Sequence, residues 1–301
     1  STGKPTFTAD WSDTRELNFE NKEMQDSMIN TMKFWVNKTK IDGFRVDVAW
    51  GVPNTFWIRC LQDLKSIRPL FFLAEADDAP LHNAGFDATY TWREYNVIKE
   101  VAAGKKDVTY LDTIFNTIDT SFMKGAWRLY FTSNHDENSW NKADFETMPG
   151  IIHAPFAVLA LTYNRTMPLI YSGQEEPVLR ALQFFEKDPI QFNKYERASF
   201  YTALLQLRNS NKAFGEKAQF KRLSVNNPNA IMAYQRVFEN DKVVVVLNLS
   251  NKAQVGDLAL NGQASNYKEL FSGKIFNNIK HIELPAWGYQ VFVKMNEAIN
   301  R

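Results

Sequence analysis

Short apolar runs alternate with segments whose apolar residues recur at helical spacing, and this alternation most constrains the fold. The first helical stripe, behind an expected N-cap at Asn21, consists of Met24, Met28, Met32 and Trp35. A strand-like run follows at 44–48. Further stripes lie at 56–64, 111–122, 156–161 and 200–207, and further runs at 70–74, 86–90, 129–132 and 167–173. About five strands separated by helices predict an α/β fold with a parallel sheet and right-handed crossovers.

The residue pattern changes after about residue 214, from helices alternating with strands to short β-rich segments. Short β-rich segments at 230–237, 243–249 and 290–293 are separated by polar turns such as Glu239-Asn240-Asp241. We therefore predict two domains, 1–212 and 213–301, of which the second is a small antiparallel β domain. We expect this domain to pack against the first, with carbohydrate binding as the alternative.

Charge and cysteine content exclude several classes of partner and bond. The formal net charge is +1 and no Lys/Arg-rich run is present, so we expect neither nucleic acid nor an anionic membrane as a partner. Cys60 is the single cysteine, which excludes an intrachain disulfide, and its apolar neighbours predict a buried thiol. No run approaches the length of a membrane span, and residues 1–5 lack the apolar core of a signal peptide. The compartment is left open, and an extracellular or periplasmic location would follow if an upstream signal peptide has been removed.

Three carboxylates stand at the ends of separate strand-like runs: Asp47, Glu75 and Asp136. A single carboxylate at a strand end is more often a helix cap or a member of a surface ion pair. Three carboxylates in order, each at the end of its own run, favour a catalytic role more strongly. Because the loops beyond the ends of parallel strands share one face, we expect these side chains to converge on one pocket. A pair of carboxyl groups, one ionised and one protonated, is what cleavage of a glycosidic bond requires. The sequence therefore predicts sugar chemistry.

Two neighbouring residues can assist these carboxylates. Arg45 precedes Asp47 by two positions, so the two side chains lie on the same side of a strand and the arginine can keep the aspartate ionised. An ordinary ion pair inside the domain is the alternative reading. His135 can donate a hydrogen bond to a sugar hydroxyl, or it can serve a structural role only. The other histidines are scattered along the chain, so we expect no metal cluster.

Three of these segments resemble the ordered signatures of the α-amylase family of glycoside hydrolases, family 13. They are Gly43-Phe44-Arg45-Val46-Asp47, Phe72-Leu73-Ala74-Glu75 and Asn134-His135-Asp136. Supporting matches are Ile41-Asp42, Phe86-Asp87-Ala88 and the segment 168–175. The resemblance covers about residues 7 to 294.

The resemblance implies a (β/α)8 TIM barrel and a retaining mechanism on α-1,4-glucosidic bonds in starch, maltooligosaccharides or cyclodextrins. It implies that Asp47 is the nucleophile and Glu75 the general acid/base. It further implies that Asp136 grips sugar hydroxyls and stabilises the transition state, supported by Arg45 and His135.

The chain departs from the family pattern just after the first signature. Trp50 and Gly51 stand where most relatives carry a basic pair that lines acceptor subsites. Trp50 can stack on an acceptor sugar, because a ring face suits the apolar face of a pyranose, or it can simply pack. Both interpretations stay open. The type of glycosidic bond that is cleaved and the product that is released therefore stay open as well.

A larger departure is that the family's first signature, at the end of the third barrel strand, has no counterpart. Residues 1–20, with Trp11-Ser12-Asp13 and Leu17-Asn18, resemble the stretch that follows the family's inserted subdomain after the third barrel strand. The chain therefore resembles the C-terminal portion of a longer enzyme: a barrel portion lacking the first strands, followed by a β-sandwich domain. Five strands alone leave two open edges, so we expect the missing N-terminal part to be needed as a second chain or a neighbouring copy. We expect no cofactor in this chain, and the resemblance places the family's calcium ligands in the missing part.

The sequence is compatible with several functional classes. The leading interpretation is a retaining α-glucan hydrolase or transglycosylase. The alternatives are a non-catalytic carbohydrate-binding or scaffold relative of the same barrel, an inactive fragment that needs its N-terminal part, and a sucrose- or trehalose-active enzyme on the same fold.

Overall fold

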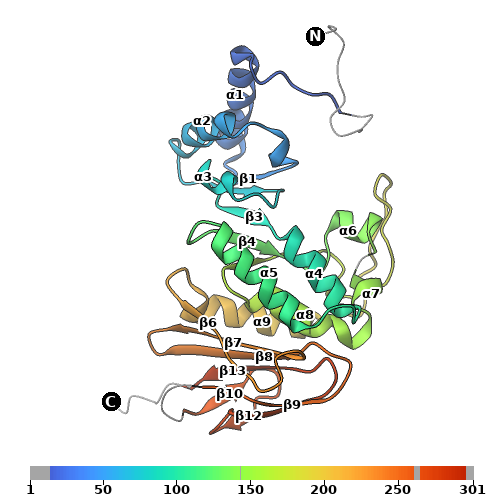
Figure 1. Cartoon of the computed structure of the whole chain (residues 1–301). Helices are drawn as coiled ribbons and strands as arrows, with labels where there is room; N and C mark the ends of the chain where they lie inside the picture. The colour runs from blue at the N-terminus through green and yellow to red at the C-terminus, as the bar shows by residue number, and fades with distance from the viewer. Residues whose placement is uncertain (1–13, 143, 261–264, 296–301) are drawn as a thin grey trace. The chain divides into compact units, whose positions relative to one another are not determined.

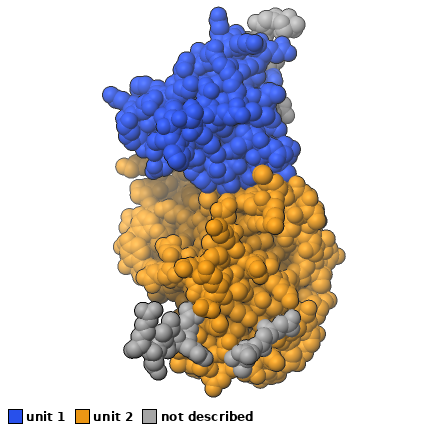
Figure 2. Space-filling model, turned by 90° about the vertical axis from the view of Figure 1, so that its left-hand side faces the viewer, with its two compact units in different colours: residues 1–90 blue, residues 91–301 orange. Residues whose placement is uncertain are grey.

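The computed structural model describes residues 14–142, 144–260 and 265–295. The segment Trp11-Ser12-Asp13 lies outside the described residues. The chain forms two compact units, residues 1–90 and residues 91–301, which are coloured separately in Figure 2 and described one at a time below.

The first unit is a parallel three-stranded sheet with helices. Its strands pair in chain order, β1 with β2 and β2 with β3. The strands are β1 (Gly43–Val46), β2 (Phe71–Ala74) and β3 (Ala88–Tyr90), and the helices are α1 (Lys22–Thr39), η1 (Ala49–Gly51), α2 (Asn54–Lys65) and α3 (Pro80–Asn83). The predicted parallel arrangement is confirmed for this unit.

Gly43, the first residue of the first signature, has a steric role in this sheet. A Cβ atom at this position would lie 1.7 Å from the carbonyl oxygen of Phe71 on β2. No other residue type fits without moving one of the two strands.

Helix α1 (Figure 1) begins as predicted but turns a different face inward. The Asn21 side chain accepts hydrogen bonds from the backbone N–H groups of Glu23 and Met24, so the expected N-cap is confirmed. The buried residues are Ile29 and Val36, however, whereas Met28 and Trp35 are exposed. The predicted stripe is therefore wrong at these two positions. The helix carries two overlapping apolar stripes, and contact with α2 selects the one through Ile29, Met32 and Val36.

Helix α2 buries the whole stripe predicted for it. Phe56, Trp57, Cys60, Leu61 and Leu64 are all buried in the core of the first unit. Burial is the main reason that the pKa of the Cys60 thiol rises to about 12. The prediction of a buried thiol is confirmed.

The second unit opens with alternating helices and parallel strands. Strands β4 (Trp127–Tyr130) and β5 (Thr166–Pro168) pair in parallel. The helices are α4 (Trp92–Ala102), α5 (Val108–Ser121), α6 (His135–Trp140), α7 (Asp144–Thr147), η2 (Gly150–Ile152), α8 (His153–Thr162), α9 (Ala198–Ser210) and η3 (Lys212–Phe214).

A buried ion pair ties β4 to the preceding helix. Arg128 on β4 contacts both carboxylate oxygens of Glu94 on α4 at 3.0 Å, and both side chains are buried. The guanidinium also lies 4.0 Å from the centre of the Phe122 ring. Because a buried charge is tolerated only when paired, this contact fixes β4 against α4.

The rest of the second unit is antiparallel, as predicted. A six-stranded sheet has the order β11-β10-β13-β8-β7-β6, and β12 pairs with β9. The strands are β6 (Gln219–Arg222), β7 (Ile231–Phe238), β8 (Asp241–Asn248), β9 (Gln254–Asp257), β10 (Tyr267–Glu269), β11 (Ile275–Phe276), β12 (His281–Leu284) and β13 (Tyr289–Lys294). Apolar side chains from both sheets share one core, which includes Val244, Val246, Ile282 and Phe292.

Helices of the second unit lie beside its antiparallel sheet (Figure 1), and polar contacts join the two. Arg222 on β6 pairs with Asp112 on α5 at 2.7 Å, and the Tyr234 hydroxyl on β7 lies 2.6 Å from the Thr162 hydroxyl on α8. These contacts agree with the expectation that the β segments pack against the preceding helices. The boundary at 212/213 stays a prediction. No helix of the described residues is long and apolar enough to span a membrane.

Candidate active site

The first unit brings together three of the predicted site residues. Asp47 follows β1 and Glu75 follows β2, and Arg45 on β1 lies between their carboxylates. The guanidinium pairs with the Asp47 carboxylate through Nη1, and its Nη2 lies 2.6 Å from Glu75 Oε1. The expected same-side placement of Arg45 and Asp47 is therefore found, and the arginine holds two carboxylates rather than one.

Asp47 and Glu75 differ in their surroundings. The Asp47 side chain is 70 % exposed and lines an open groove together with residues 14–20, Val52 and Phe56. The Glu75 side chain is only 12 % exposed. Desolvation therefore acts mainly on Glu75, which separates the roles that the two carboxyl groups can take.

Burial is the main cause of a raised pKa at Glu75, to about 7. A hydrogen bond with Asp47 and the charge of Asp47 raise this pKa further, whereas the Val48 N–H and Arg45 oppose the shift. A carboxyl group with a pKa near neutrality can give up a proton in one step and recover it in the next.

Val48 was not identified from the sequence, although it lies between Asp47 and the η1 turn. Its backbone is left-handed, with φ 46° and ψ 43°, a conformation that β-branched residues rarely adopt. In this conformation its N–H donates to Glu75 Oε2 at 3.1 Å. A strained residue that orients a candidate catalytic group is a common feature of active sites.

Tyr90, at the end of β3, was also missed. Its hydroxyl accepts a hydrogen bond from Arg45 Nε at 3.3 Å, and the guanidinium lies 5.7 Å from the centre of its ring. The sequence did indicate this position, because the strand-like run 86–90 ends at Tyr90, at the same edge of the sheet as Asp47 and Glu75.

Trp50 lies in the η1 turn three residues after Asp47. Its side chain is 56 % exposed, so the alternative that Trp50 simply packs in the core is not favoured. The neighbouring Ala49 is fully buried, and its carbonyl accepts a hydrogen bond from the Trp57 indole at 3.1 Å, which anchors the turn that carries Trp50.

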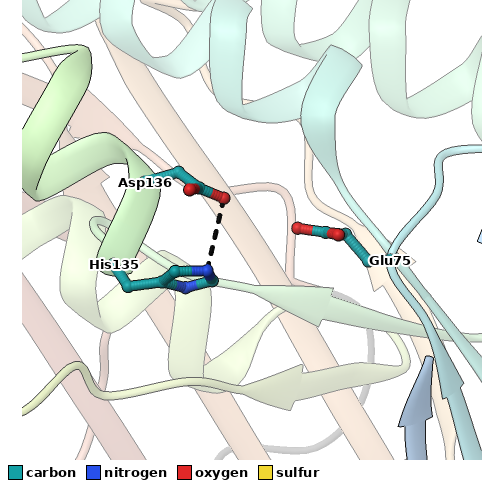
Figure 3. A group of neighbouring side chains, drawn as sticks. All are labelled: Glu75, His135 and Asp136. Carbon is teal, nitrogen blue, oxygen red and sulfur yellow. Dashed lines mark ion pairs between the residues drawn. The ribbon is translucent and has the colours of Figure 1, made fainter. Parts of the chain in front are cut away.

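His135 and Asp136 belong to the second unit, in the first turn of α6. Asn134 caps this helix, since its side-chain oxygen accepts from the Glu137 N–H at 2.8 Å. The His135 Nε2 atom lies 3.5 Å from Asp136 Oδ2, the pair joined by the dashed line in Figure 3. Glu75, also drawn there, belongs to the first unit, so the convergence of the three carboxylates stays a prediction.

The loop after β5 supplies groups near Asp136 within the second unit. Burial and the charge of Asp136 raise the pKa of Tyr171. The Gln174 side chain accepts from the Tyr171 N–H at 2.8 Å and donates to Thr132 Oγ1 at 2.7 Å, which ties this loop to the segment after β4. In the sequence, Tyr171 stood out only as part of the segment 168–175, which resembles the family pattern.

Within either unit alone, the described residues hold no group of three closely spaced His, Cys, Asp or Glu ligand atoms. The functional groups assembled in each unit are carboxylates with arginine, tyrosine or histidine partners.

Two family models match separate parts of the chain. The α-amylase catalytic domain matches residues 7–58, and the maltogenic amylase C-terminal domain matches residues 220–291.

Curated relatives with matching sequences are amylases and cyclomaltodextrinases. Alpha-amylase 2 of Dictyoglomus thermophilum is 26 % identical over 87 % of this chain and 48 % of its own length. Alpha-amylase MalA of Haloarcula japonica is 28 % identical over 83 % of this chain and 37 % of its own length. A cyclomaltodextrinase of Thermoanaerobacter pseudethanolicus is 25 % identical over 84 % of this chain and 45 % of its own length. The chain thus spans less than half the length of these relatives.

Solved structures agree in fold. The maltogenic α-amylase AmyB of Thermotoga neapolitana superposes with a TM-score of 0.81 at 22 % identity, covering 97 % of this chain and 68 % of that one. An α-amylase from Lactobacillus plantarum superposes with a TM-score of 0.80 at 18 % identity, covering 96 % of this chain and 71 % of that one.

The parallel and antiparallel sheets, the sequence relatives and the structural neighbours together match a portion of the α-amylase fold. The chain thus resembles the α-amylase family, glycoside hydrolase family 13, as its sequence signatures predicted.

Proposed function

We propose that this chain contributes to a retaining hydrolase of α-1,4-linked glucans, with Asp47 as nucleophile and Glu75 as general acid/base. The observation that carries this proposal is the Arg45 pair: one guanidinium joins an exposed carboxylate to a buried carboxyl whose pKa lies near 7. Two carboxyl groups in such unequal surroundings suit the two roles of a retaining glycosidase.

In the first step, the ionised Asp47 attacks the anomeric carbon while protonated Glu75 gives its proton to the departing glycosidic oxygen. Arg45 is assigned to hold Asp47 ionised, which its ion pair with that carboxylate supports. Val48 is assigned to orient Glu75 through its N–H.

In the second step, ionised Glu75 removes a proton from water, and the resulting nucleophile releases the sugar from Asp47. Two inversions return the anomeric carbon to its starting configuration. Asp136 is assigned to bind sugar hydroxyls and to stabilise the transition state. His135 is assigned to donate a hydrogen bond to a sugar hydroxyl, and Trp50 is assigned to stack on an acceptor sugar. The family's calcium stays assigned by resemblance to the part outside this chain.

The test of this function is the anomer first released from maltoheptaose, followed by proton NMR in the active form of the protein. We expect the α-anomer to appear before mutarotation, with no turnover of the β-linked cellohexaose. A first-formed β-anomer would contradict the retaining mechanism. Binding of maltoheptaose without any turnover would favour the scaffold alternative.

We further propose that the five parallel strands belong to a TIM barrel completed by residues outside this chain, and that the antiparallel segments form the β-sandwich domain of the family. Among the described residues of the first unit, β1 has a strand partner only in β2. Phe34 and Trp35 on α1 are about half exposed, which suits a further layer of protein.

Barrel completion predicts that the isolated 301-residue chain has weak stability and little activity, because its open edge and exposed aromatics lack their partners. Adding the N-terminal half of the barrel as a separate chain is expected to restore cooperative unfolding and hydrolysis together, as measured by circular dichroism and maltoheptaose turnover. A monomeric, cooperatively folded and fully hydrolytic isolated chain would show this proposal to be wrong.

A further inference from the structure

Three lysines of the second unit lie on one face of the six-stranded sheet, near the same end of that sheet. This lysine cluster consists of Lys221 on β6, Lys242 on β8 and Lys294 on β13. Strands β6, β7, β8 and β13 are neighbours in the sheet (Figure 1). Residues directly opposite one another in an antiparallel ladder share a face, so the register places the cluster on the face that carries Val244 and Phe292. The cluster therefore borders the core between the two antiparallel sheets.

Lys242 and Lys294 form a pair of like charges. The register of β13 with β8, in which Val293 lies opposite Val243, places Lys294 directly opposite Lys242. Both side chains are half-buried, and Lys242 Nζ lies 6.0 Å from the centre of the Tyr267 ring. Burial and the charge of Lys294 lower the pKa of Lys242. Like charges directly opposite each other destabilise a sheet, and burial reduces their screening by salt, so this pair costs stability in the free protein.

Within the described residues, no carboxylate forms an ion pair with any lysine of the cluster. Two acidic residues lie close to it in the strand register. Asp241 precedes the lysine on β8, so it lies on the opposite face, and its carboxylate accepts from the Lys212 N–H at 3.0 Å. Glu269 on β10 accepts from the N–H groups of Phe271 and Ser272 at 3.1 and 2.7 Å. Both carboxylates are therefore engaged elsewhere.

A buried amide oxygen lies within the cluster. Gln235 on β7 is directly opposite Lys221 in the register and diagonal to Lys242. Its side-chain oxygen is buried and accepts no hydrogen bond from the part of the chain that the structure describes. A buried polar atom without a partner costs free energy, so a ligand that donates a hydrogen bond at this position is favoured. The cluster thus combines positive charge with one acceptor.

We propose that the lysine cluster binds a phosphate dianion, either inorganic phosphate or the phosphate group of a small monoester. The ammonium groups of Lys242 and Lys294 donate hydrogen bonds to the phosphate oxygens, and Lys221 adds a third positive charge. The P–OH group of inorganic phosphate, or a hydroxyl group of the ester, donates to the side-chain oxygen of Gln235. A dianion suits this site because it neutralises both members of the like-charge pair at once. The proposal does not rest on the proposed function.

Isothermal titration with inorganic phosphate and, separately, with glucose 6-phosphate tests this proposal at neutral pH and low ionic strength. The tighter of the two ligands identifies the source of the phosphate group. Lys242→Met and Lys294→Met each remove a charge but keep an unbranched side chain, and each is expected to weaken binding by about 3- to 10-fold. Lys242→Arg keeps the charge and is expected to retain most of the affinity. Lys268→Met is the matched control, because the exposed Lys268 lies opposite Val293 and hence on the other face of the sheet.

Thermal unfolding of the same samples gives a second readout that misfolding of a variant would not reproduce. Without phosphate, Lys242→Met should raise the midpoint of unfolding, because it removes the repulsion between the paired charges. Added phosphate should raise the midpoint of the parent protein more than that of this variant, since only the parent has the complete site. No binding of either ligand to the parent would overturn the proposal. Equal affinities in the parent, the two methionine variants and the Lys268→Met control would also overturn it.

Discussion

Replacing Asp47 with Asn lowers the turnover of maltoheptaose by about 10⁴- to 10⁶-fold in our account, the range reported for loss of a nucleophile in other hydrolases. The amide cannot attack the anomeric carbon, and the Arg45 guanidinium loses the charge that it holds next to the reacting centre. The change is nearly isosteric and the side chain is largely exposed, so the fold should tolerate it. Steady-state kinetics with circular dichroism on the same samples measure both effects.

Asp42→Asn is the matched control for this substitution. Asp42 lies five residues before Asp47, its side chain is 97 % exposed, and it pairs only loosely with Arg68 at 3.2 Å. Turnover is expected to stay within about twofold of the parent, since exposed ion pairs of this kind contribute little. A loss of less than tenfold at Asp47, or an equal loss at Asp42, would be incompatible with a nucleophilic Asp47.

The second large effect is expected at Glu75. Glu75→Gln should reduce turnover of maltoheptaose by about 10²- to 10⁴-fold, because the departing oxygen is no longer protonated. α-Maltosyl fluoride should be cleaved far better by this variant, since fluoride departs without a proton. The ratio of the two rates, measured on one preparation, separates loss of the acid from general damage to the site. Equal losses on both substrates would speak against Glu75 as the acid.

The pH profile gives an independent view of the same group. The pKa of Glu75 near 7 means that the free protein holds the proton below this pH and loses it above. The rate constant kcat/KM for maltoheptaose should therefore fall as the pH rises through about 7, and Glu75→Gln should lack this fall. The same sign applies to stability, because the raised pKa favours the folded form at low pH and this advantage disappears above pH 7. A kcat/KM that stays level to pH 9 would contradict the assignment.

The sequence predicted best what depends on spacing within one element. The α2 stripe was correct at every position, because its apolar residues fall on a single face. The α1 stripe failed at Met28 and Trp35, because that helix carries two apolar faces and only contact with α2 decides between them. Period two along β1 correctly placed Arg45 and Asp47 on one side.

What the sequence could not reveal depends on backbone strain or on distant segments. Nothing in the residue type marks Val48 as left-handed, since valine disfavours that conformation and only the surrounding structure can impose it. The contact of Arg45 with Tyr90 spans 45 positions, and the lysine cluster joins residue 221 to residues 242 and 294. Long-range contacts of this kind have no local periodicity by which to recognise them.

The most direct test of the central claim is to trap the sugar on the protein. The Glu75→Gln variant is incubated with a 5-fluoro-α-maltosyl fluoride, which forms the glycosyl-enzyme but hydrolyses slowly, and the digested protein is analysed by peptide mass spectrometry. Our account predicts one added 5-fluoromaltosyl group, on the peptide that contains Asp47 and on its carboxylate, with the anomeric fluoride lost. A label on another residue, or none while the protein consumes maltoheptaose, would contradict the assignment of Asp47 as nucleophile.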